Sequence, residues 1–211
     1  MKIFNKSLLV AALAASVMFT SCDEEETEIP NENELITTVI LELYDESNPN
    51  NEVHLHWEDI DLDGKPEIET EALAANTTYH GHIEFLNELA EKDEDDHDDE
   101  DGHNHRTLED DHDHDHEHDH GYDVTETIEK EDEDHQVFYV VDPADLATIE
   151  YEDEDGNGMP LGLEIELTTG DAGTGTLNIV LKHEPTKSKD ATLETAGGST
   201  DIDVKFDITV E

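Results

Sequence analysis

The chain has 211 residues, of which 60 are Asp or Glu and only 10 are Lys or Arg, so its formal net charge at pH 7 is −50. A negative field of this size repels phosphate backbones and anionic lipid headgroups, which argues against nucleic acid as a partner and favours cations. The single cysteine excludes an intramolecular disulfide framework.

The first residues have the organisation of a secretory leader. Two lysines precede an apolar run over residues 8–19, and two small residues lie directly before Cys22. A basic start, a short apolar core and small residues at the cut are typical of a signal peptide, and the run is too short to span a bilayer comfortably. The cysteine after this core resembles the lipobox of bacterial lipoproteins, which implies that residues 1–21 are removed and Cys22 is lipidated. An ordinary secretory cut that leaves a free thiol is the alternative.

Residues 22–34 are predicted to form an acidic tether between the lipid and the folded part of the chain. The acids at residues 23–26 resemble the tag that follows the cysteine in surface-exposed lipoproteins of the Bacteroidota. The resemblance implies an outer-membrane lipoprotein of the cell envelope that faces the surface or the periplasm. Membrane contact would come from the lipid, since the charge of the chain opposes it.

Residues 35–211 show the alternation of apolar and polar residues that predicts β-strands. We expect about eight strands, at residues 35–44, 53–57, 79–85, 137–141, 149–151, 161–167, 177–181 and 202–210. Clusters of Gly, Asn, Asp and Pro separate them, which favours a single antiparallel β-sandwich. The only helices we expect are a short acidic helix at residues 125–133 and one turn at residues 142–144.

A His-rich and Asp-rich insertion at residues 92–121 interrupts the sandwich. Leu108 is its only large apolar residue, so we expect a long disordered loop without a packed core. Neutral imidazole binds zinc, copper and nickel, and carboxylates supply oxygen ligands, so the insertion is a predicted metal-binding segment. The alternative is an acidic loop that only solubilises the protein. The insertion holds eight of the 14 histidines: His97, His103, His105, His112, His114, His116, His118 and His120.

Two further pairs of histidines alternate with apolar residues on predicted strands. His54 and His56 flank Leu55, and His80 and His82 flank Gly81, so all four are expected to point to solvent. If the two strands are neighbours in one sheet, the four imidazoles would converge on a single ion. The alternative is that they are ordinary exposed histidines on a polar sheet face.

Two acidic turns match calcium-loop patterns. The full pattern is met by Asp153, Asp155, Asn157, Gly158 and Glu164. Its first half is met by Asp59, Asp61, Asp63 and Gly64, with Thr70 where a bidentate Glu is needed. Strand-like flanks around the first turn favour a hairpin built on Asn157–Gly158, and a loose calcium site is the alternative.

Short phrases at residues 36–39, 59–64, 73–79, 85–88, 133–138 and 197–202 carry a family resemblance. They resemble small Bacteroidota surface lipoproteins labelled "type 1 periplasmic binding fold superfamily protein", and the likeness covers most of residues 35–211. The label implies a βαβ fold. The sequence does not alternate strands with long helices, so we expect the sandwich instead.

The sequence contains neither a G-x-S-x-G nucleophile motif nor a Gly-rich phosphate loop, and it predicts a protein that is not an enzyme. Two functions remain. The first is a lipid-anchored protein that binds divalent transition metal ions, zinc before copper or nickel, to capture them, buffer them or hand them to an outer-membrane metal receptor. The second is a structural or adhesive surface module with a solubilising loop and a candidate calcium site.

Overall fold

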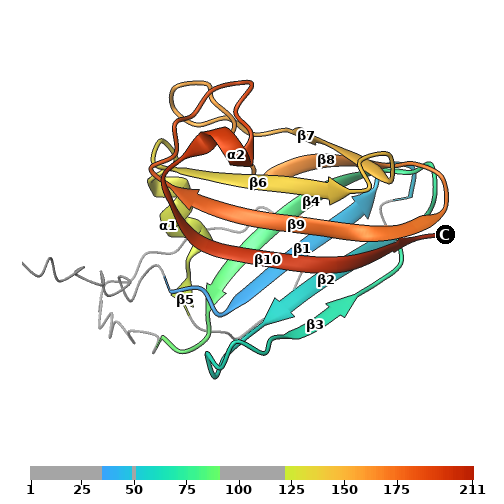
Figure 1. Ribbon diagram of the computed structural model, residues 1–211, viewed down its shortest axis with the longest axis horizontal. Coiled ribbons are helices and arrows are strands. Elements are labelled where there is room, and N and C mark those ends of the chain that lie inside the picture. Colours follow the sequence, from blue (N-terminus) through green and yellow to red (C-terminus); the bar gives the residue numbers. More distant parts are fainter. Residues whose placement is uncertain (1–34, 49–50, 91–121) are drawn as a thin grey trace, which may run out of the picture.

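The computed structural model describes residues 35–48, 51–90 and 122–211, which form two antiparallel β-sheets packed face to face (Figure 1). The larger sheet contains β1 (Thr38–Asp45), β2 (Glu52–Glu58), β3 (Glu67–Thr70), β4 (Thr78–Asn87), β5 (Tyr122–Asp123), β7 (Ala147–Tyr151) and β8 (Glu164–Thr169). Its order is β3-β2-β1-β4-β8-β7, and β5 pairs with β4. The smaller sheet has the order β10-β9-β6, formed by β6 (His135–Asp142), β9 (Gly173–His183) and β10 (Ser199–Val210). The predicted mainly-β sandwich is therefore confirmed.

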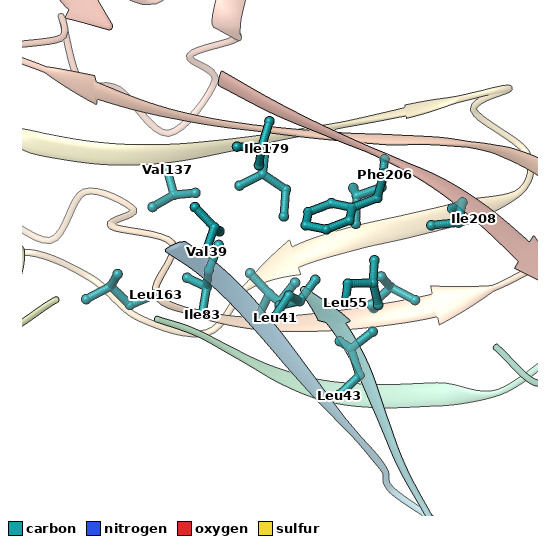
Figure 2. Packing of buried hydrophobic residues seen from close by; sticks show 14 of the residues in the cluster. Val39, Leu41, Leu43, Leu55, Ile83, Val137, Leu163, Ile179, Phe206 and Ile208 are labelled. Carbon is teal, nitrogen blue, oxygen red and sulfur yellow. The ribbon is translucent and has the colours of Figure 1, made fainter. Parts of the chain in front are cut away.

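The hydrophobic core lies between the two sheets. Val39, Leu41 and Leu43 of β1 are fully buried, and Ile179 and Phe206 of the smaller sheet lie on the other side of the same core (Figure 2). Because successive side chains of a strand point to opposite faces, the residues between these apolar positions lie on the outer faces of the sandwich. The alternation seen in the sequence is thus the alternation between core and surface.

The structure differs from the predicted elements in four places. The described residues contain ten strands rather than about eight: β3 is exposed along its whole length, so no buried face reveals it, and β5 has only two residues. Residues 161–163 precede β8 instead of belonging to it. The acidic helix is confirmed as α1 (Thr125–Lys130), whereas residues 142–144 contain the end of β6 and a turn. A second short helix, α2 (Leu193–Ala196), was not predicted.

The ends of the insertion meet at one point of the fold. Asn87, the last residue of β4, lies opposite Tyr122, the first residue of β5. The described residues on the two sides of the insertion therefore meet in one ladder. Loop-closure cost rises slowly with length, so this connection tolerates a long insertion.

Several predicted segments lie outside the described residues. These are the leader at residues 1–21, the tether at residues 22–34 with Cys22, and the insertion at residues 92–121 with its eight histidines. Within the described ranges, no helix has both the length and the apolar character needed to cross a membrane.

Candidate metal centre

Histidine and glutamate alternate across the outer face of the larger sheet. In the strand register, Glu42 of β1 lies opposite His54 of β2 on one side and opposite His82 of β4 on the other. His82 in turn lies opposite Glu164 of β8. A row of alternating imidazoles and carboxylates therefore crosses four strands, on the side of the sheet that faces away from the core.

The predicted convergence of four imidazoles requires β2 and β4 to be neighbours, and they are not. The two strands share a sheet and a face, but β1 lies between them. Adjacent strands are about 4.8 Å apart, so the histidines of β2 and β4 are separated by roughly 9.6 Å across the sheet. This part of the prediction is wrong. Glu42 of β1 lies between His54 and His82, so a carboxylate separates these two imidazoles.

Glu42, Glu52 and His54 form a cluster of three metal-ligating side chains. One ligand atom from each lies within 4.8 Å of the others, and all three residues are half-buried. Nε2 of His54 is 2.8 Å from Oε1 of Glu52. The Tyr44 hydroxyl donates a hydrogen bond of 2.7 Å to Oε2 of Glu42. Burial, together with this carboxylate, raises the pKa of Tyr44, so the phenol keeps its proton and holds Glu42 in place.

Glu42 and His54 of this cluster line a basin of about 540 Å³ on the outer face of β1, β2 and β3. Two imidazoles and five carboxylates line it, together with two isoleucines: His54, His56, Glu42, Glu58, Glu69, Glu71, Glu88, Ile40 and Ile60. Among the described residues, no Lys or Arg contributes to this lining. Carboxylates gathered in a concave surface raise the local concentration of cations, so the basin favours divalent ions.

The other three outer-face histidines have carboxylate neighbours of their own. Nδ1 of His80 is 2.7 Å from Oε2 of Glu152, and this hydrogen bond raises the pKa of His80 above its ordinary value. Since protons compete with metal ions for the imidazole lone pair, this raised pKa disfavours metal binding at His80. His82 and His56 have looser contacts, at 3.9 Å to Glu84 and 3.8 Å to Glu58.

One of the two acidic turns brings its carboxylates together. Ligand atoms of Asp59, Asp61 and Asp63 lie within 4.8 Å of one another. Both oxygens of Asp59 already accept backbone N–H groups, from Asp63 at 3.2 Å and from Gly64 at 3.0 Å. Lys65 also donates to the Asp63 carboxylate and supplies a competing positive charge. The turn is a candidate cation site whose first carboxylate has a structural role.

The other acidic turn uses its carboxylates to build a hairpin. Asp153 accepts N–H groups from residues 162–164, and Asp155 accepts those of Asn157 and Met159 at 2.8 and 2.9 Å. Burial acts to raise the pKa of Asp155, but the Lys187 ammonium 2.8 Å away and these N–H groups outweigh it, and the pKa lies below its usual range. In the described part of the chain, these acids do not form a ligand cluster with Glu164. The antiparallel bridge between Glu154 and Pro160 confirms the hairpin interpretation.

Sequence reasoning missed several of the clustered residues. Glu42 and Glu52 alternate with apolar residues like the histidines, but their position beside His54 follows only from the strand register. A third cluster, formed by His135, His183 and Asp201, joins residues that are distant in the sequence and match no ligand spacing.

A scan against protein-family models and searches of curated proteins and of solved structures find no match to this chain. The interpretation of the site therefore depends on its geometry and chemistry.

Proposed function

We propose that the chain is a lipid-anchored envelope protein that binds divalent transition metal ions, zinc first and copper or nickel as alternatives. The observation that carries the proposal is the Glu42–Glu52–His54 cluster, of which Glu42 and His54 line the anionic basin. The bound ions would be captured, buffered or handed to an outer-membrane metal receptor.

The composition of the cluster favours transition ions over calcium. An imidazole nitrogen with two carboxylate oxygens is a ligand set suited to zinc, whereas calcium takes six to eight oxygen ligands. Three protein ligands leave a fourth position open, which suits an ion that is exchanged rather than buried.

The position of the insertion supports a role in delivering ions to the basin. Glu88 lies on the rim of the basin, and the His-rich stretch at residues 92–121 begins shortly after it in the sequence. Ions held by the stretch would thus be close to the cluster. The histidines of the stretch would bind many ions, and the basin would provide one fixed site.

Replacing Glu42 tests the fixed site. Glu42→Gln removes a charged ligand and keeps the shape of the side chain, so we expect zinc affinity at one site to fall by more than about tenfold, since even outer-shell partners of a metal contribute that much. The measurement is calorimetric titration of the mature chain with zinc, copper, nickel and calcium.

Glu69→Gln is the matched control, because Glu69 lines the same basin but does not belong to the three-ligand cluster. It removes the same charge and should leave the tight site intact. Equal zinc binding by the Glu42 variant, the Glu69 variant and the unchanged chain would refute the site.

The anchor is tested by Cys22→Ser. The lipobox-like sequence and the resemblance to small Bacteroidota lipoproteins support lipidation of Cys22. We expect the variant to remain uncleaved or to appear in the soluble fraction, because it lacks the sulfur that carries the lipid. Detergent partitioning and the mass of the mature chain measure this. A variant that still matures normally and partitions into detergent would contradict the anchor.

A second candidate function is a surface module that binds calcium. The Asp59–Asp61–Asp63 cluster favours it, because its ligands are all oxygen. The calcium arm of the same titration separates the two functions: heat from calcium alone supports the module, and heat from zinc supports the proposed function.

A further inference from the structure

A second cluster of metal-ligating side chains lies at one end of the smaller sheet, apart from the basin. His135 is the first residue of β6 and His183 the last of β9, and the two lie directly opposite each other in the register. Asp201 of β10 completes the group, and one ligand atom from each residue lies within 4.8 Å of the others. His135 is only 2% exposed.

A bulge in β10 brings Asp201 to the histidines. Thr200 pairs with Lys182 and Ile202 pairs with Leu181, so Asp201 is the extra residue between two regular pairs. A bulge of this kind redirects a side chain without disturbing the ladder on either side. One carboxylate oxygen of Asp201 thereby lies 3.9 Å from Nε2 of His135, and the side chain is 15% exposed.

Hydrogen bonding fixes which nitrogen of His135 is the ligand. Nδ1 lies 3.1 Å from the carbonyl oxygen of Glu131, just after α1. A carbonyl can only accept, so Nδ1 carries a proton, and Nε2, which lies 3.9 Å from a carboxylate oxygen of Asp201, is the nitrogen left to bind an ion. A backbone carbonyl that holds the far nitrogen of an imidazole is the usual support of a metal-binding histidine.

The spacing fits a small divalent ion. The His135 and His183 rings are stacked, with centroids 4.7 Å apart and planes 24° apart. An ion bonded to two such atoms at about 2.1 Å spans up to about 4.2 Å. The 3.9 Å between Nε2 of His135 and Asp201 is within that span, and the other separations, which are all below 4.8 Å, need a contraction of at most roughly 0.6 Å.

We propose that His135, His183 and Asp201 bind one first-row divalent ion of the zinc class and thereby clamp the ends of β6, β9 and β10 together. Two imidazoles and one carboxylate leave a fourth position for water. This site is enclosed, whereas the basin is open. It goes beyond the proposed function, because its ion stabilises the fold.

Stability measurements distinguish this site from the other ligands. His135, His183 and Asp201 come together only when the chain is folded, so an ion bound there raises the melting temperature. The histidines at residues 112–120 are neighbours in the sequence and are available in the unfolded chain as well, so their ions add little to the difference between the two states.

The experiment compares the melting temperature of the mature chain with and without zinc, with Glu42→Gln present throughout to remove the basin site. With zinc at a hundredfold excess over its Kd, we expect a rise of about 5–10 °C. Asp201→Asn, which keeps the shape of the side chain, should abolish the rise. His183→Gln is a second variant with the same expected loss, in case the first does not fold.

Glu69→Gln is the control that should leave the rise unchanged. A zinc-dependent rise that persists in full in a folded Asp201→Asn chain would overturn the proposal, as would the absence of any rise before Asp201 is changed. Neither outcome depends on the basin site. If the basin site does not exist, the zinc titration of the Glu42→Gln chain gives the same heats as that of the unchanged chain.

Discussion

Deleting residues 93–120 is expected to remove most of the transition metal bound by the mature chain. The deletion takes away all eight histidines of the insertion, whereas each candidate cluster among the described residues offers ligands for one ion. The affinity of the insertion should follow the usual order, copper over zinc. Metal content after dialysis, measured by mass spectrometry, checks the loss.

The pH dependence of this binding follows from proton competition. Protons and metal ions compete for the imidazole lone pair, so binding should weaken as the pH falls through about 6.5, the ordinary pKa of histidine. Carboxylates close to an imidazole favour its protonated form and move the midpoint upward, as the hydrogen bond from Glu152 raises the pKa of His80.

The matched control keeps the length and acidity of the insertion and replaces its eight histidines with Gln. If the histidines are the ligands, this chain should lose as much metal as the deletion. The sandwich should stay folded in both variants, because Asn87 and Tyr122 hold the two ends of the insertion together in the β4–β5 ladder. Unchanged metal stoichiometry in the deletion would refute the role of the insertion.

Phe206→Ala is expected to lower the free energy of unfolding by about 3–5 kcal/mol, the usual cost of removing a large aromatic side chain from a packed core. Phe206 of β10 is fully buried between the two sheets (Figure 2). Urea denaturation followed by circular dichroism measures the change.

Val140→Ala is the control for this substitution. Val140 lies on β6 of the same sheet, but its side chain is 43% exposed, so its loss should change the free energy of unfolding by no more than about 0.5 kcal/mol. Similar effects of the two substitutions would mean that the core between the sheets does not hold the sandwich together.

Much of the fold could be predicted from strand periodicity, because the alternation of side chains along a strand depends only on residues that are near in the sequence. Val53 and Leu55 are buried and His54 and His56 are not, as the period of two requires. The prediction failed where that contrast is missing. All four residues of β3 are exposed, so no alternation between core and surface marks the strand.

The acidic turns show the limit of residue type as a guide to chemistry. Asp153 and Asp59 occupy the same first position of a calcium pattern, and both accept backbone N–H groups, but among the described residues Asp59 also lies in a cluster of carboxylates and Asp153 does not. A carboxylate oxygen accepts an N–H group or binds a cation equally well. Which of the two it does depends on what the fold places around it.

Alternation in the sequence predicts which side chains face the core. The composition shows where histidines and carboxylates are concentrated and that the electrostatic field around them is negative. Only the tertiary structure decided that β1 separates β2 from β4, that Glu42 lies beside His54, and that a bulge brings Asp201 to His135. The pleat fixes the alternation of side chains within one strand. Strand order and register instead depend on packing between residues that are far apart in the chain. Because the cost of closing a loop grows slowly with its length, many such strand pairings are open to the same sequence.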